Sequence, residues 1–259
     1  MHKWGNPTAV SIIGTLKYLA ILVNKNIAET RTKAQAMIIA GQIFVDGKLV
    51  KKSGEIYNFF SKIKVKNLQP QWVSRGALKI IHAIKHFNIN IEDLICLDIG
   101  ASTGGFTDVL LSYKAKKIYA VDVGHNQLHE KLKTEKRVIN IEKTNARYLD
   151  KSIINEPIDI LVCDVSFISL KKILKPSLKL LKHTSGIVIA LIKPQFEAKK
   201  NEIMKGGIIT DQLIHQRVCD EISKWLKDEC HLKILGIIQS PIKGTKGNIE
   251  FLIVAQKLF

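Results

Sequence analysis

Cysteine is scarce in this chain, with four residues among 259 and no C-x-x-C pair. The missing pairs argue against a zinc site, and a chain of this length does not need a disulfide framework. Each cysteine lies in an apolar run, so we interpret all four as buried thiols: Cys96, Cys163, Cys219 and Cys230.

Long apolar runs are missing as well. No stretch reaches 18 apolar residues, so we expect no transmembrane helix and no stable membrane association. Residues 8–23 faintly resemble the apolar region of a signal peptide, but Lys17 interrupts them and no small-residue cleavage site follows. We therefore expect the protein in the cytoplasm.

Acidic residues are few relative to basic ones. The 40 Lys and Arg against 23 Asp and Glu give a formal net charge of +17. Such a surplus is typical of proteins that bind a polyanion, with nucleic acid as the first candidate. A lysine-rich codon bias is the alternative, because 35 of the cations are Lys and only five are Arg. Hydrophobic residues at 46% and charged residues at 24% exclude a disordered chain.

The first 65 residues predict a small α+β module. A helical pattern over 16–23 precedes a second helix, which Thr30 can cap and Gly41 can end. Residues 42–50 then read as a strand, an Asp-Gly turn and a strand. Ten Lys and Arg against three acids make the segment basic, which is typical of a small RNA-binding module and, by itself, equally of a solvated basic face.

From residue 73 onward, helical stretches alternate with short apolar strands. This pattern predicts a doubly wound, Rossmann-like parallel sheet of the α/β class. The expected strands are 95–99, 117–121, 138–141, 158–163, 186–192, 232–239 and 251–255. The expected helices are 76–87, 105–114, 126–133, 169–182 and 210–228.

A glycine-rich loop follows the first of these strands. Gly100, Gly104 and Gly105 have the spacing G-x-x-x-G-G, which differs from the G-x-G-x-x-G of a dinucleotide site. Glycines at a strand-to-helix turn allow a ligand to approach the backbone. Asp122 ends the next strand, where an acid can accept hydrogen bonds from ribose hydroxyls. The pair predicts a site for an adenosine-containing ligand, with a structural turn and a surface Asp as the alternative.

Four further charged residues stand at positions where chemistry is expected. Asp164 and Lys193 each end an apolar strand, and ligands of open α/β sheets bind at the carboxyl ends of strands. Lys79 and Glu250 lie at the start of the first helix and just before the last strand. A lysine flanked by acids can lose its proton and then deprotonate a hydroxyl. Singly each residue reads as a solvated charge or a salt bridge, but the set of four indicates a catalytic site.

Six ordered motifs resemble the TlyA/hemolysin A family. They are Val-Ser-Arg-Gly-Ala-Leu-Lys (73–79), Asp-Ile-Gly-Ala-Ser-Thr-Gly-Gly-Phe-Thr-Asp (98–108), Asp-Val-Gly-His-Asn-Gln-Leu (122–128), Cys-Asp-Val-Ser-Phe-Ile-Ser-Leu (163–170), Leu-Ile-Lys-Pro-Gln-Phe-Glu (191–197) and Lys-Gly-Gly-Ile-Ile-Thr-Asp (205–211). The resemblance implies an rRNA 2′-O-methyltransferase that uses S-adenosylmethionine and acts on cytidine ribose in small- or large-subunit rRNA. It implies an RNA-binding domain of the ribosomal protein S-four type at 16–66, a linker at 67–73 and an FtsJ/RrmJ-like catalytic domain at 74–259.

The resemblance also implies roles for individual residues. The family's Lys-Asp-Lys-Glu tetrad maps onto Lys79, Asp164, Lys193 and Glu250. We interpret Lys193 as the general base and Asp164 as the group that orients it. The expected cofactor-binding residues are Asp98, Gly100, Ser102, Gly104, Gly105, Asp122, Asn145 and Ala146. The candidate RNA contacts are Lys25, Arg31, Lys33, Lys48 and Arg75, with rRNA or a ribosomal subunit as the partner.

Two other functions are weighed against this one. A membrane-active hemolysin finds little support in a sequence without a spanning segment. A non-enzymatic RNA-binding factor would have no need for the tetrad and the glycine loop. His125 and His129 have the spacing of metal ligands on a helix, but no third ligand is evident, so we expect no metal site.

Overall fold

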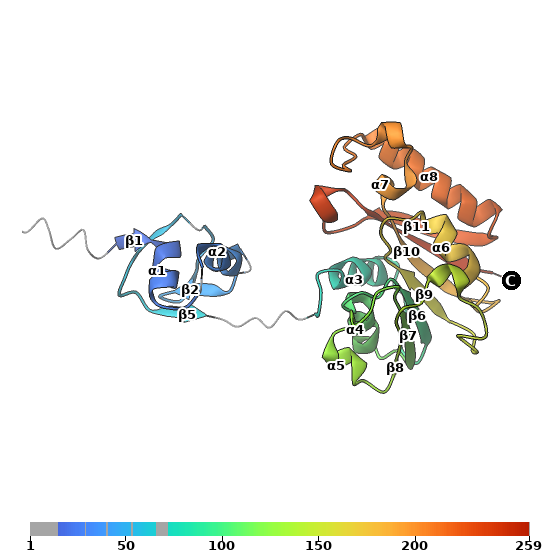
Figure 1. Cartoon of the computed structure of the whole chain (residues 1–259), viewed down its shortest axis with the longest axis horizontal. Helices are drawn as coiled ribbons and strands as arrows, with labels where there is room; N and C mark the ends of the chain where they lie inside the picture. Colours follow the sequence, from blue (N-terminus) through green and yellow to red (C-terminus); the bar gives the residue numbers. More distant parts are fainter. Residues whose placement is uncertain (1–14, 29, 40, 53, 66–71, 259) are drawn as a thin grey trace, which may run out of the picture. The chain divides into compact units, whose positions relative to one another are not determined.

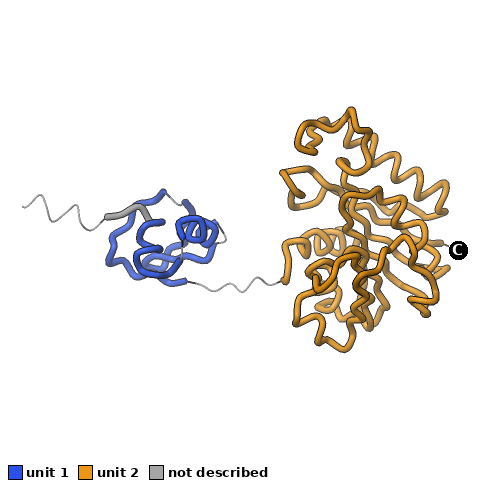
Figure 2. Tube along the Cα trace, viewed as in Figure 1, with its two compact units in different colours: residues 1–71 blue, residues 72–259 orange. Residues whose placement is uncertain are grey.

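The chain forms two compact units, residues 1–71 and 72–259 (Figure 2). The structure is a computed structural model that describes residues 15–28, 30–39, 41–52, 54–65 and 72–258. The expected linker, 67–73, falls largely outside these ranges. Among the described helices, none combines the length and the apolar character needed to cross a bilayer.

The smaller unit combines two helices with short antiparallel strands. Its elements are β1 (Thr15–Lys17), α1 (Tyr18–Asn24), α2 (Arg31–Ile39), β2 (Ile43–Val45), β3 (Lys48–Leu49), β4 (Ile56–Asn58) and β5 (Ile63–Val65). Strand β2 pairs with β3 and β5, and β1 pairs with β4. Side chains from both helices and β2, among them Ile21, Leu22, Ile38 and Ile43, form a separate core.

The structure of the smaller unit agrees with the predicted helix cap and hairpin turn but not with the predicted start of the first helix. The Thr30 hydroxyl accepts a hydrogen bond from Lys33 N at 3.1 Å, as a helix cap does. Asp46 and Gly47 both have positive φ, which matches the twist of a tight hairpin turn. The helix expected over 16–23 begins only at Tyr18, because the residues before it pair with β4.

The larger unit is built on a seven-stranded sheet (Figure 1). In chain order its elements are α3 (Ala77–His86), β6 (Ile95–Ile99), α4 (Gly105–Ser112), β7 (Lys117–Val121), α5 (Glu130–Lys133), β8 (Val138–Ile141), η1 (Ala146–Tyr148), β9 (Ile160–Cys163), α6 (Leu170–Ser177), β10 (Ile187–Ile192), α7 (Pro194–Glu197), η2 (Lys200–Glu202), α8 (Gln212–Asp228), β11 (Leu232–Gln239), η3 (Thr245–Gly247) and β12 (Phe251–Lys257). The strand order β11-β12-β10-β9-β6-β7-β8 is doubly wound, which confirms the predicted fold class.

The sheet is parallel except at its last strand. Strand β12 runs antiparallel to both β10 and β11, which corrects the expectation of a wholly parallel sheet. The connection from β11 to β12, residues 240–250, is too short for a helical crossover, so the chain turns back on itself. This reversal brings the beginning of β12 to the edge where the parallel strands end.

Helices cover both faces of the sheet. Apolar residues of α3 and α4 pack on one face, where Ile80 and Val109 meet strand residues such as Ile118. Helices α6 and α8 pack on the other, where Leu174 and Trp225 share a second core. Because strand side chains alternate between faces, nearly every residue of the central strands is buried.

Two predicted helices are shorter than expected. The segment 126–133 is helical only from Glu130, because the residues before it form a loop held by Glu142. The segment 169–182 leaves the helix after Ser177. Pro176 has no N–H to continue the hydrogen-bond ladder, and Leu181 then pairs with Ile158 as an extended bridge.

Candidate active site

The four residues of the predicted tetrad meet at one edge of the sheet. Asp164 follows β9 and Lys193 follows β10, so both stand at the carboxyl ends of parallel strands. Glu250 precedes β12, whose first residue, Phe251, pairs with the last residue of β10, Ile192. The strand order reverses between β6 and β9, where open α/β sheets bind their ligands.

Lys79 reaches this edge from α3 and lies between two carboxylates. Its Nζ is 3.0 Å from Asp164 Oδ2 and 2.7 Å from Glu250 Oε2. Lys193 Nζ is 2.6 Å from the other oxygen of Asp164 and donates a hydrogen bond to Ser166 Oγ at 2.9 Å. Two ammonium groups and two carboxylates thus form one continuous network centred on Asp164.

Burial makes this network electrostatically strong. Lys79, Lys193 and Glu250 expose between 2% and 8% of their surface. Burial by itself would lower the pKa of Lys79, but Asp164 and Glu250 outweigh it and the pKa is raised. Burial would likewise raise the pKa of Asp164, but the ammonium groups of Lys193 and Lys79 lower it overall. Lys79 and Asp164 are therefore held in their charged forms.

A cavity of about 410 Å³ opens onto the network. Lys79, Asp164 and Lys193 line it together with Ser166. Its other walls come from the glycine loop, the start of α3 and the loop before β12: Gly100, Ala101, Ser102, Thr103, Gly105, Phe106, Ser74, Arg75, Gly76, Ile242, Lys243, Gly244 and Thr245. The exposed Arg75 thus lies at the site itself.

A second cavity of about 370 Å³ adjoins the first and shares Gly100, Ser102, Asp164 and Ser166 with it. Apolar side chains such as Ile99, Val121 and Ile173 line it together with polar residues. The lining includes the predicted residues Asp122, Asn145 and Ala146. An elongated ligand with a flat apolar end and polar substituents fits the joined cavities.

The glycine loop is shaped by close contacts. Gly100 has a φ of +79°, and a Cβ there would lie 2.6 Å from the Asp164 carbonyl oxygen. Gly104 precedes α4 with a φ of +95°, and a Cβ there would collide with Leu132 and Leu128. Gly105 lines the first cavity, whereas Gly104 is absent from the described lining of both. Close packing against these leucines therefore explains why a glycine is needed at position 104. The predicted contact of Gly104 with a cofactor stays a prediction.

Asp98 lies beneath the loop rather than in a cavity. It is 1% exposed, and Thr107 Oγ1 donates a hydrogen bond to its Oδ2 at 2.7 Å. Burial raises the pKa of Asp98 to about 7, although the bond from Thr107 opposes the shift. The described cavity linings do not include Asp98, and its predicted contact with a cofactor stays a prediction.

Asp122 holds the loop that borders the second cavity. Its carboxylate accepts hydrogen bonds from Ser102 N at 2.8 Å and Gly124 N at 2.7 Å. Each oxygen keeps a second lone pair for a ligand hydroxyl. The backbone of the same loop is bonded to the segment after β8, through Lys143 N to Gly124 O at 3.0 Å and Thr144 N to Asp122 O at 3.0 Å.

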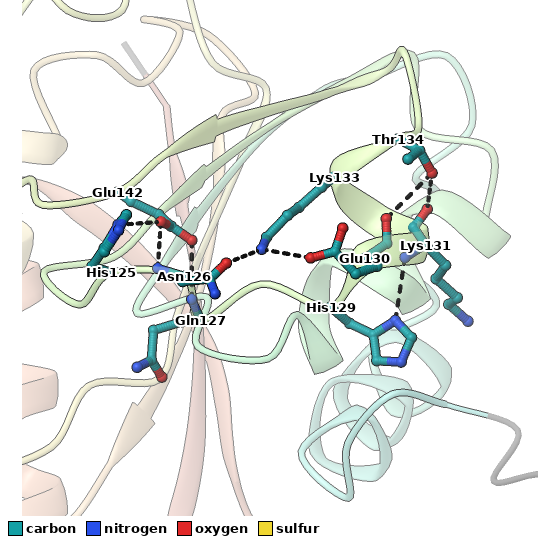
Figure 3. A network of polar contacts seen from close by, with 9 residues as sticks. All are labelled: His125, Asn126, Gln127, His129, Glu130, Lys131, Lys133, Thr134 and Glu142. Atoms are coloured by element: carbon teal, nitrogen blue, oxygen red, sulfur yellow. Dashed lines mark hydrogen bonds and ion pairs between the residues drawn. The ribbon is translucent and has the colours of Figure 1, made fainter.

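Glu142 fastens these two loops together (Figure 3). Its carboxylate accepts hydrogen bonds from Asn126 N at 2.6 Å and Gln127 N at 3.0 Å, and it lies 3.2 Å from His125 Nδ1. These bonds, first of all the one from Asn126 N, lower the pKa of Glu142 to about 2. The loop is therefore anchored by a carboxylate that stays charged.

Each of the two histidines of this region has a partner within the protein. His129 caps α5 by accepting a hydrogen bond from Lys131 N at 3.3 Å, and His125 contacts Glu142 (Figure 3). Within the described ranges, no three His, Cys, Asp or Glu side chains are grouped as metal ligands.

The remaining predicted RNA contacts lie in the smaller unit. Lys25, Arg31, Lys33 and Lys48 are exposed there. Lys25 Nζ lies 5.0 Å from the centre of the Phe59 ring, a cation–π contact. Their role in RNA binding stays a prediction.

Sequence reasoning did not single out several residues that shape the site. Ser166 binds Lys193 and lines both cavities, Thr107 holds Asp98, and Glu142 holds the loop after Asp122. Ser166 follows Asp164 by two residues, which is the one local signal that could have identified it. Gly244 packs so tightly against Glu250 that a Cβ would collide with its carboxylate.

The fold and the site together define a Rossmann-like methyltransferase joined to a small RNA-binding-type module. The larger unit matches the FtsJ-like methyltransferase family over residues 72–257, and residues 19–60 match the S4 domain. The chain belongs to the FtsJ-like methyltransferase family.

Several named proteins are similar to this chain over most of its length. Hemolysin A of Brachyspira hyodysenteriae is 46% identical over 86% of this chain and 92% of its own length. The 16S/23S rRNA (cytidine-2′-O)-methyltransferase TlyA of Mycobacterium tuberculosis is 36% identical over 90% of this chain and 87% of its own. The solved structure of a protein from Streptococcus thermophilus that is named as a hemolysin is also similar. It has a TM-score of 0.72 and 38% identity, over 95% of this chain and 89% of that one. These matches confirm the predicted family resemblance.

Proposed function

We propose that this protein transfers a methyl group from S-adenosylmethionine to a ribose 2′-hydroxyl of ribosomal RNA. The observation that carries the proposal is the buried network of Lys79, Asp164, Lys193 and Glu250 at the mouth of two joined cavities. One cavity suits a nucleoside cofactor, and the other brings a hydroxyl substrate to the lysines. The relative named as a 16S/23S rRNA (cytidine-2′-O)-methyltransferase supports cytidine in one or both subunits as the target.

The residues of the second cavity suit S-adenosylmethionine. Ile99, Val121 and Ile173 would pack against adenine, Asn145 and Ala146 would flank it, and Asp122 would accept from its ribose. Gly100, Ser102 and Gly105 would pass the methionine end toward Asp164. When bound, the cofactor supplies an activated methyl group, which the ribose 2′-oxygen takes as the carbon–sulfur bond breaks.

The protein's own task is to position the hydroxyl and to remove its proton. Lys79 lies between two carboxylates, whereas Lys193 shares Asp164 with Lys79 and has the Ser166 hydroxyl as its other partner. Lys193, which has one carboxylate partner where Lys79 has two, is therefore our candidate for the general base. As the general base, Lys193 would accept the 2′-hydroxyl proton when the methyl group is transferred.

The other lysine and the acids keep this arrangement in place. Asp164 orients Lys193, and Glu250 neutralises Lys79, which would hold the 2′-oxygen. Residues 16–66 would act as the RNA-binding domain and 74–259 as the catalytic domain, with Lys25, Arg31, Lys33, Lys48 and Arg75 as RNA contacts. An rRNA substrate makes the cytoplasm the proposed compartment.

The decisive experiment follows a labelled methyl group into RNA. The protein is incubated with each ribosomal subunit and S-adenosylmethionine labelled in its methyl group, and ribose-bound label is counted after nuclease digestion. Lys193→Met should lose about 10²–10⁴-fold in rate, the usual contribution of a positioned general base. Its cofactor affinity should stay within a few-fold of wild type, as measured by calorimetry.

Lys85→Met is the matched control, because Lys85 is an exposed lysine of α3 outside the site. Label in rRNA ribose with wild type and Lys85→Met, but not with Lys193→Met, is the expected pattern. Wild-type turnover by Lys193→Met would refute the assignment of the base. RNA binding without cofactor uptake would identify the protein as a non-enzymatic RNA-binding factor.

A further inference from the structure

A basic groove lies on the α6 face of the larger unit, apart from the catalytic network. It has a volume of about 560 Å³ and five cationic side chains in its lining: Arg147, Lys171, Lys172, Lys175 and Lys179. We call it the α6 groove. Its described lining contains no acidic residue, and Trp225 and Pro176 complete it.

The cations of the α6 groove form no close ion pairs among the described residues. None of the five forms a salt bridge with another described residue, whereas Lys182, just beyond α6, pairs with Asp159. Arg147, Lys172, Lys175 and Lys179 are exposed, so their charges face solvent. Four like charges this close repel one another, a cost that a bound polyanion would relieve.

The two lysines at the start of α6 stand where helix stability does not favour cations. Lys172 and Lys175 are three residues apart in α6, which puts two like charges on one side of the helix, and Lys179 follows two residues after its end. Lys171 and Lys172 occupy the first turn of α6, where the helix dipole favours acids, and that turn contains none. The negative charge at this end is Glu197 of α7, which accepts a hydrogen bond from Leu170 N at 2.6 Å. Helix stability therefore does not account for the two lysines of the first turn.

The α6 groove begins beside the proposed cofactor cavity. Arg147 directly follows Ala146, and Lys172 directly precedes Ile173; both Ala146 and Ile173 line the second cavity. Helix α6 starts six residues after Asp164. The cations therefore continue from the catalytic edge along one flank of the unit.

We infer that the α6 groove binds the phosphate backbone of the substrate RNA beside the nucleotide being methylated. This inference rests on the proposed RNA substrate and adds a docking surface that belongs to the larger unit. The contacts would be with phosphates and would carry no sequence information, because lysines bind phosphate as point charges. They would fix the direction in which the strand leaves the active site.

An anionic membrane is the other polyanion that such a groove could meet. Interfacial binding needs exposed apolar side chains that enter the lipid beside the cations. The largest apolar residue in the lining, Trp225, is only 5% exposed, and the other is Pro176. The groove therefore suits a hydrophilic polymer better than a lipid surface.

The test reverses charge in the groove and reads the salt dependence of RNA binding. Lys172→Glu/Lys175→Glu is compared with wild type for binding to purified 16S rRNA at several salt concentrations. Because each phosphate contact contributes about 0.7–0.9 to the slope of log K against log salt, loss of two contacts should lower the slope by about 1.5. The affinity for S-adenosylmethionine should not change, which shows that the unit remains folded.

Lys85→Glu/Lys136→Glu is the matched control, since both lysines are exposed, lie outside the α6 groove and give the same change in net charge. An equal fall of the slope in this control, or an unchanged slope in the groove variant, overturns the inference. So does a groove variant that loses binding to phosphatidylglycerol vesicles while keeping its RNA slope. If wild type itself shows no salt-dependent RNA binding, the proposed function fails, an outcome distinct from failure of the groove alone.

Discussion

At the scale of single residues, Lys79 is the one described ion-pair partner of Glu250 and also shares Asp164 with Lys193. It is 7% exposed and forms ion pairs with Asp164 and Glu250. Removing one partner of a buried ion pair leaves an uncompensated charge and costs about 3–5 kcal/mol. Lys79→Met should therefore lower the free energy of unfolding by roughly this amount, as measured by urea denaturation.

The pairing itself is tested by a double-mutant cycle. Once Lys79 is replaced by Met, Glu250→Gln should cost much less than it does in wild type, because the carboxylate has already lost its partner. Strictly additive losses would show that the two side chains do not interact.

The second prediction at the residue scale concerns Asp98 and the dependence of folding stability on pH. Burial raises its pKa to about 7, against about 3.9 in an unfolded chain. Between these values the unfolded chain releases a proton that the folded chain keeps, so stability falls as pH rises and levels off above pH 7. Asp98→Asn carries no such proton and keeps an acceptor for Thr107.

The free energy of unfolding of Asp98→Asn minus that of wild type should therefore rise by about 2–3 kcal/mol from pH 5 to pH 8. Denaturant unfolding of both proteins at the two pH values measures this difference. A difference that is the same at both would show that Asp98 ionises with an ordinary pKa.

At the scale of elements, the loops after β7 and β8 form one wall of the proposed cofactor cavity, and Glu142 joins them. Glu142→Gln keeps the shape but removes the charge, which weakens each hydrogen bond from the loop amides. A loosened loop should weaken the binding of S-adenosylmethionine by roughly tenfold. We expect that rise in Kd and KM for the cofactor with little change in kcat.

Glu130→Gln is the control from the same region (Figure 3). Glu130 pairs with Lys133 on the surface, and its side chain is 79% exposed, so its loss should not affect the cofactor. If Glu142→Gln lowered kcat and left cofactor affinity intact, the loop would serve the chemical step instead.

At the scale of the whole molecule, the two units have separate hydrophobic cores. A ligand stabilises only the unit that binds it, by about 2.7 kcal/mol at one hundred times its Kd. Calorimetric unfolding should therefore show two transitions, and S-adenosylhomocysteine, the demethylated product, should raise the temperature of only one. A single transition that moves as a whole would mean that the units unfold together.

Much of the fold and part of the site follow from local sequence. Alternating helical and strand patterns were enough for the doubly wound sheet, because each depends on the spacing of neighbouring residues. Asp164 and Lys193 could be placed at one edge from sequence alone, since parallel strands all end on the same side. Their chemical roles, like those of the cofactor and RNA residues, stay predictions.

What the tertiary structure decided concerns residues that are distant in sequence. The reversal of β12 brings Glu250 to Lys79 across 171 positions, and no local pattern encodes that meeting. Glu142 reaches the loop after Asp122, and Arg147 joins the lysines of α6, only because separate strands end beside one another. Sequence periodicity reports which face of an element is buried, whereas the partners of a charged side chain depend on how the elements pack.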